Sequence, residues 1–249
     1  MNRRHLLALS ATVLSSMPRA ARAAETPWLM RVVPGPREGD AWLAGLEIIL
    51  QPHWKTYWRV PGQGGVPPDV TVKGANIKAS ELLLPTPTRL QSAGGEAIGY
   101  REQVTFLLRV TPIDPGKPVA GDVAAFIGVC EDICIPAQFA GHVEFGRTAN
   151  DDALAHWRAA IPQAADFVTL AKAIEVDGQP ALQLDLSRPV DDIFVEGSAL
   201  HYFEAPSFDG PRATLKVAGA GSVDELRKVP LRITARIAQG GLEQTVTVV

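Results

Sequence analysis

The stretch YREQVTFLLRVTPI, residues 100–113, sets Val104, Phe106 and Leu108 on one face at a period of two. Such alternation is the pattern of a half-buried β-strand. Other runs of strand length lie on either side of it, and 22 Gly and 20 Pro residues are scattered between them as turn signals. These runs are WLAGLEIIL (42–50), VTVKG (70–74), LLLPTPTRL (82–90), DVAAFIGV (122–129) and QFAGHVEFG (138–146). They predict a β-rich domain that closes near Gly146.

One helix is predicted in the middle of the chain, at DDALAHWRAAI, residues 151–161. Asp at its start suits an N-cap, Ala and Leu favour helix, and Pro162 lies just beyond its end. The sequence then returns to short strand patterns, with a hairpin expected at Asp177-Gly178, and its turn signals suit a second small sandwich. The predicted fold class is therefore all-β, with two immunoglobulin-like β-sandwich domains, residues 24–148 and 149–249, joined by a short helix.

The first 23 residues differ from the rest of the chain. A positive start, MNRRHLL, is followed by the apolar run LLALSATVLSSM and by the small-residue pattern ARA at residues 21–23. This order predicts a secretory signal peptide over residues 1–23, through the general route or, because Arg3 and Arg4 are paired, the twin-arginine route. No later segment is long and apolar enough to span a membrane. The mature chain is expected in the periplasm, where disulfides persist.

Composition excludes several classes of function. The chain has 46% hydrophobic and 20% charged residues and a formal net charge of -3, with both signs interspersed. It therefore has no basic stripe for nucleic acid. No Ser-His-Asp order, glycine-rich phosphate loop or paired-carboxylate pattern stands out, so hydrolase and nucleotide-binding functions are set aside. We expect no resident cofactor or metal.

The two cysteines of the chain, Cys130 and Cys134, lie close together in FIGVCEDICIPAQF, residues 126–139. A structural disulfide is the common fate of such a pair in an exported protein. A loop of about five residues, however, restrains the unfolded chain by roughly 2 kcal/mol, against about 4.7 kcal/mol for a loop of about 100 residues. A tight bridge at a strand end is also more readily reduced than a relaxed one. The spacing therefore favours a redox-active pair.

The residues between the cysteines indicate the direction of the chemistry. Glu131 and Asp132 are acidic, and like charge raises the pKa of a cysteine thiol and disfavours its thiolate. A dithiol of this kind is a better electron donor than oxidant. The spacing is not the C-x-x-C of thioredoxin, so we expect the pair to receive electrons from such a domain.

Two segments resemble a known family. HWKTYWRVPGQGGVPPDV (53–70) and GVCEDICIPA (128–137) are similar to the amino-terminal domain of the thiol:disulfide interchange protein DsbD, and most similar to its ScsB (suppressor of copper sensitivity) branch. DDIFVEG, YFEAP and VPLRITARIAQG in the second half resemble the β-domain that follows in that branch.

The resemblance implies an immunoglobulin-like domain in which Cys130 and Cys134 are the exchanging pair. They would accept electrons from a thioredoxin-like donor and pass them to periplasmic disulfide oxidoreductases. It also implies a cap loop over the cysteines at GGEAIGYREQ (94–103), where Ala97 and Ile98 stand near the tip position that carries aromatic residues in the family. The family's membrane conduit and terminal thioredoxin-like domain are not in this sequence, so a membrane thiol transporter is a further expected partner.

The remaining candidate residues have simpler interpretations. Packing is favoured over docking for three aromatic residues: Trp54, Tyr57 and Trp58. Four histidines lack ligand spacing: His53, His142, His156 and His201. Two thiolates with His53 or His142 would nevertheless suit Cu(I). Three function classes stay open: a disulfide reductase or electron relay, a copper-handling protein using the same cysteines, and a binding module with a structural disulfide.

Overall fold

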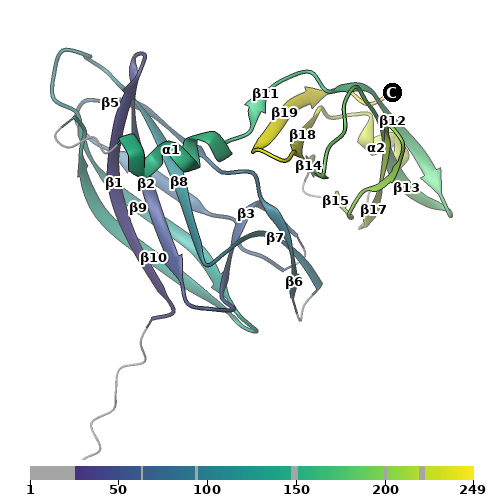
Figure 1. Ribbon diagram of the computed structural model, residues 1–249, viewed down its shortest axis with the longest axis horizontal. Helices are drawn as coiled ribbons and strands as arrows, with labels where there is room; N and C mark the ends of the chain where they lie inside the picture. Colours follow the sequence, from purple (N-terminus) through teal and green to yellow (C-terminus); the bar gives the residue numbers. More distant parts are fainter. Residues whose placement is uncertain (1–25, 63, 93–94, 147–150, 199–200, 219–221) are drawn as a thin grey trace, which may run out of the picture.

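The computed structural model describes residues 26–62, 64–92, 95–146, 151–198, 201–218 and 222–249. In these residues the chain forms two β-rich halves joined by helix α1 (Asp151–Ala160) (Figure 1). Each half contains two sheets around an apolar core. The predicted all-β class, with two immunoglobulin-like sandwiches and a short connecting helix, is confirmed. The predicted signal peptide and the expected boundary at 148/149 lie outside the described residues.

In the first sandwich, the described strands that are hydrogen-bonded to each other run antiparallel. One sheet has the order β1-β2-β8-β5, and the other has the order β10-β9-β3-β7-β6 with β4 beside β9. The strands are β1 (Trp28–Glu38), β2 (Ala41–Leu50), β3 (Lys55–Gly62), β4 (Asp69–Lys73), β5 (Ile77–Leu83), β6 (Thr88–Ser92), β7 (Gly95–Arg101), β8 (Gln103–Pro112), β9 (Ala120–Cys130) and β10 (Cys134–Glu144).

The second sandwich has sheets in the orders β11-β19-β18-β14 and β12-β13-β17-β15, with β16 beside β17. The hairpin predicted at Asp177-Gly178 is confirmed, since both residues have positive φ and Val176 pairs with Gln179. The elements are β11 (Gln163–Ala164), β12 (Val168–Val176), β13 (Gln179–Leu186), β14 (Asp192–Glu196), β15 (Tyr202–Phe203), β16 (Ser207–Asp209), β17 (Arg212–Ala218), α2 (Val223–Leu226), β18 (Leu231–Arg236) and β19 (Gly241–Val246).

Strand β8 is buried on both faces. The alternating side chains predicted from the sequence lie in the core: Val104, Phe106 and Leu108. The opposite face is covered because α1 lies across β1 and β8 (Figure 1). Leu154 of α1 occupies the space beside Gly35 and Gly45, where an added Cβ would come within 2.5 and 2.7 Å of its methyl groups. These glycines therefore seat the connecting helix on the first sandwich.

One predicted strand is divided in two. The run LLLPTPTRL was expected to form a single strand, but β5 ends at Leu83 and β6 begins at Thr88. Pro85 and Pro87 lie between them, and proline has no N–H to donate to a sheet ladder. The break lets the chain cross from one sheet of the sandwich to the other.

The two sandwiches meet through β3 and β14. The rings of Trp58 and Phe194 pack with their centroids 5.8 Å apart, and neither side chain is exposed. Arg59 stacks over the Trp58 ring at 4.3 Å, pairs with Glu196 at 2.6 Å and also pairs with Glu243. Phe194 thus completes the core of the first sandwich although it belongs to the second.

Alkaline pH is expected to weaken this fold. Burial raises the pKa of each of the three tyrosines, and that of Tyr202 reaches about 12 from an ordinary value of 10.0, with nearby Glu96 adding to the effect. The unfolded chain therefore releases these protons at a lower pH than the folded chain does. The contribution of Tyr202 to stability is complete below pH 10 and is lost as pH rises toward 12. Urea unfolding from pH 9 to 11.5 should show a falling free energy of unfolding. The fall should be shallower in Tyr202→Phe, and an equal slope in both proteins would contradict this assignment.

Candidate functional site: a disulfide at a hairpin tip

The two cysteines close the hairpin of β9 and β10. Cys130 ends β9, Cys134 begins β10, and the two are direct cross-strand partners with Cα atoms 4.1 Å apart. They are joined by a disulfide bond. The three residues of the connecting turn are exposed, and Ile133 is 77% exposed. The structure therefore places the predicted site residues together at the tip of a hairpin.

The two sulfurs have different surroundings. Cys130 is 1% exposed and belongs to a small apolar cluster with Tyr57, Leu90 and Ala97. Cys134 is an exposed residue. An incoming thiol can therefore reach the disulfide at Cys134, whereas Cys130 is covered.

Tyr57 is the aromatic residue that contacts the disulfide. Its hydroxyl lies 3.2 Å from the Sγ of Cys134. Its ring fits between two glycines, since a Cβ at Gly65 would lie 2.8 Å from the ring and one at Gly128 3.2 Å from it. The Gly-rich segment after β3 thus makes room for this ring. Burial raises the pKa of Tyr57, so its O–H stays protonated and available to donate to sulfur.

Sequence reasoning had assigned Tyr57 to packing, and at 4% exposed the residue is indeed buried. The contact with Cys134 was missed because it joins residues 77 positions apart. Cross-strand register brings them together, since Thr56 pairs with Val129 between β3 and β9. A tyrosine shortly before the glycine-rich run GQGG (62–65) was the available signal in the sequence.

Lys55 adds a positive charge at the same turn. It pairs with Cys130 in the β3–β9 register and donates from Nζ to the backbone carbonyl of Glu131 at 2.8 Å. The residue is 3% exposed, and burial, then Arg101, lowers its pKa, against the opposing effect of Asp132 and Glu131. The turn is therefore not purely acidic, as the sequence between the cysteines alone indicated.

The segment expected to act as a cap belongs to the hairpin of β6 and β7, here called the cap hairpin. Ala97 packs on Cys130, while Ile98 faces the core of the first sandwich. Tyr100 lies in that core as well, where its O–H donates to the Pro85 carbonyl at 2.6 Å. Gly94, at the start of the segment, lies outside the described residues. Within the described part of the cap hairpin, the cover over Cys130 is aliphatic.

Other candidate residues lie apart from the disulfide. His142 contacts Asp122 at 2.7 Å, His156 packs edge-to-face with Trp157, and His201 is buried against Ser198. In the part of the chain that the structure describes, no group of three or more His, Cys, Asp or Glu is placed to hold a metal ion.

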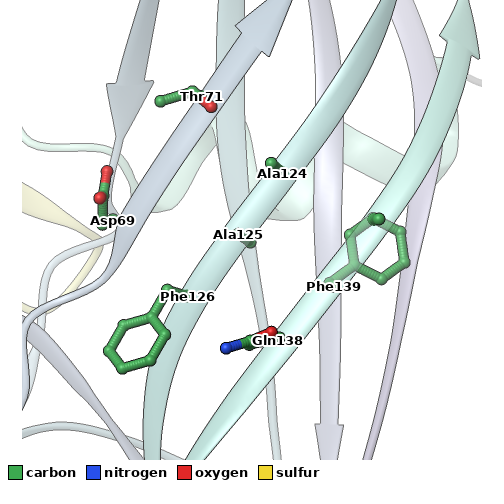
Figure 2. A pocket seen from close by; sticks show the side chains of 8 residues that line it. Asp69, Thr71, Ala124, Ala125, Phe126, Gln138 and Phe139 are labelled. Carbon is green, nitrogen blue, oxygen red and sulfur yellow. The ribbon is translucent and has the colours of Figure 1, made fainter.

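A shallow groove of about 520 Å³ runs over β4, β9 and β10 (Figure 2). Phe126, 38% exposed, and Gln138 lie side by side in it, and Asp69 is its titratable residue. Its other polar side chains are those of Thr71 and Gln138. Among the described helices, none is long and apolar enough to cross a membrane.

Comparisons with known proteins agree with this geometry. Residues 31–140 match the family described as the N-terminal part of the thiol:disulfide interchange protein DsbD. The fold is similar to the crystal structure of the N-terminal periplasmic domain of ScsB from Proteus mirabilis, with a TM-score of 0.70, 18% sequence identity, and coverage of 91% of this chain and 96% of that chain. A three-domain titin fragment, I67–I69, is matched with a TM-score of 0.21 and 12% identity over 90% of this chain and 66% of that chain. No curated protein matches. Residues 31–140 therefore match the DsbD N-terminal family, and the chain has a fold similar to that of the ScsB domain.

Proposed function

We propose that this chain is a periplasmic thiol:disulfide interchange protein. Its Cys130–Cys134 pair accepts electrons from a thioredoxin-like donor and passes them to periplasmic disulfide oxidoreductases. The observation that carries the proposal is a disulfide at a hairpin tip that joins an exposed cysteine to a buried one, in residues that match the DsbD N-terminal family. The export signal over residues 1–23 and domains over residues 24–148 and 149–249 are part of the same proposal.

The exchange consists of two substitutions at sulfur. A donor thiolate attacks the Sγ of Cys134, which is the exposed residue of the pair, the Cys130–Cys134 bond breaks, and Cys130 leaves as a thiolate that takes up a proton. The donor's second thiolate then attacks the donor sulfur of the mixed disulfide and releases Cys134, which takes up another proton. Two electrons have passed from the donor, now a disulfide, to this chain, now a dithiol. The same steps in reverse reduce an oxidised client.

Two neighbours support this chemistry. Tyr57 is placed to donate its O–H to the Cys134 sulfur as negative charge develops there. Lys55 holds the turn through the Glu131 carbonyl and supplies positive charge at the turn between the cysteines. Removal of the Tyr57 hydroxyl should therefore destabilise the reduced dithiol more than the oxidised disulfide.

For Tyr57→Phe, we expect a lower midpoint potential with little loss of stability, because the ring is kept. A net hydrogen bond of about 1 kcal/mol corresponds to roughly 20 mV for a two-electron couple. Titration against a dithiol redox buffer measures the shift. Tyr100→Phe is the matched control, since its hydroxyl donates to Pro85 rather than to sulfur, and its potential should equal that of the wild type. Equal midpoint potentials for Tyr57→Phe and Tyr100→Phe would show that the Tyr57 hydroxyl does not stabilise the reduced Cys134 sulfur.

Redox titration of the native protein tests the proposed function. We expect a midpoint potential above about -300 mV, the value below which structural disulfides of secreted proteins typically lie. Alkylation of free thiols and mass spectrometry give the oxidised fraction, with circular dichroism as a check that both states are folded. A disulfide that resists reduction until the protein unfolds would show a structural clamp instead. Tight Cu(I) binding by the reduced dithiol, without exchange, would favour the copper-handling function.

A further inference from the structure

The cap hairpin has two faces with different neighbours. Leu90 and Ala97 are cross-strand partners on one face, and both pack on Cys130. Arg89 and Glu96, each adjacent in sequence to one of these residues, point the other way and contact the second sandwich. One thin hairpin thus separates the covered sulfur from the second sandwich.

Arg89 makes most of the contacts on this outer face. Its Nε donates to Asp192 at 3.0 Å, its Nη2 donates to the Ile193 carbonyl at 2.7 Å, and its Nη1 pairs with Glu96 within the hairpin. Its guanidinium also stacks over the ring of Phe194 at 5.2 Å. The side chains of Arg89 and Asp192 are 12% and 8% exposed. These are desolvated, multidentate contacts that fix geometry, unlike an exposed ion pair.

A second contact ties the same hairpin to β15. The hydroxyl of Tyr202 donates to Glu96 at 3.3 Å, on the strand that carries Ala97. The hairpin cannot move away from Cys130 without breaking the contacts of Arg89 or of Glu96. The second sandwich is therefore mechanically linked to the cover over one sulfur.

We propose that the second sandwich is a brace that holds the cap hairpin closed over Cys130, with Arg89 as the positioning residue. The brace directs partner thiols to Cys134 and keeps Cys130 from reacting. This inference rests on the proposed function for its biological meaning, but the brace itself is a property of the chain alone.

The test uses the full mature chain with Cys134→Ala, so that Cys130 is the one thiol to be alkylated by iodoacetamide. Adding Arg89→Met should speed alkylation of Cys130 about tenfold, the factor that corresponds to 1.4 kcal/mol of lost closure. Asp192→Asn should act in the same direction, and the double variant should react no faster than the faster single variant. The matched control is Arg212→Met, because Arg212 also pairs with an Asp through Nε at 3.0 Å, but this pair joins β17 to β13 and its side chains are 50% and 33% exposed. It should change the rate less than twofold.

Local opening is separated from general destabilisation by repeating the alkylation in low urea. Opening of the hairpin alone exposes little surface, so the rate should depend weakly on urea. An unchanged Cys130 rate in folded Arg89→Met, or a urea dependence as steep as that of global unfolding, would overturn the brace. If Arg89→Met does not fold, Asp192→Asn decides by the same criteria. The alkylation test needs no partner protein, so the two proposals can fail separately. If Arg89→Met speeds alkylation of Cys130 but the native disulfide does not exchange with a thioredoxin-fold protein, only the proposed function is refuted. If the disulfide exchanges but the alkylation rate does not change, only the brace is refuted.

Discussion

Cys130→Ala should form a mixed disulfide with an oxidised thioredoxin-fold protein, whereas Cys134→Ala should scarcely react. The reason is exposure, because the remaining cysteine is an exposed residue in the first variant and is 1% exposed in the second. If opening of the cap hairpin costs about 3 kcal/mol, the two rates should differ by roughly 100-fold. Non-reducing electrophoresis and mass spectrometry of quenched samples measure both rates.

Two controls separate the effect of the fold from the intrinsic reactivity of the two thiols. Alkylation in denaturant should proceed at similar rates for the two thiols, which shows that the difference belongs to the fold. Reduced wild type should resolve the mixed disulfide quickly, because Cys130 then attacks the Cys134 sulfur and releases the partner. Equal trapping by both variants would contradict the assignment of Cys134 as the sulfur that partners attack.

The largest expected effect on stability comes from Trp58→Ala. Trp58 has no exposed surface, packs on Phe194 of the second sandwich and carries Arg59 on its ring. Removing a buried aromatic side chain costs about 3–5 kcal/mol. The loss should also loosen the contact between the two sandwiches. Urea unfolding at neutral pH, followed by circular dichroism, measures the change in free energy of unfolding.

Trp58→Phe is the matched control. It keeps an aromatic ring, and the buried Nε1 of Trp58 has no hydrogen-bond partner among the described residues, so no hydrogen bond is lost. We expect Trp58→Phe to cost clearly less than Trp58→Ala. A loss below about 1 kcal/mol for Trp58→Ala would show that Trp58 does not join the two cores as the geometry indicates.

The sequence predicts the parts of this fold that depend on local pattern. Alternation at Val104, Phe106 and Leu108 predicted β8, and the Asp177-Gly178 turn was correctly placed. Strand β1 was not predicted, and Pro34 lies within it. The strand tolerates this proline at the edge of its sheet, with a register shift after it.

The site could be predicted only in part. Spacing brought attention to Cys130 and Cys134, but nothing local distinguished the covered sulfur from the exposed one. That difference comes from Tyr57 and from the cap hairpin, which reach the cysteines through sheet register. Arg89 gave no signal in the sequence, since Asp192 and Ile193, its partners in the second sandwich, lie more than 100 positions away.

The most direct measurement is electron transfer from a reduced thioredoxin-fold protein to the oxidised, folded chain, followed by rapid acid quenching, alkylation and mass spectrometry. We predict that the Cys130–Cys134 disulfide is converted to a dithiol in step with oxidation of the donor, through a mixed disulfide at Cys134, and that the reaction reverses when oxidised donor is added in excess. A disulfide that stays oxidised in the folded chain while the donor stays reduced would contradict an interchange function.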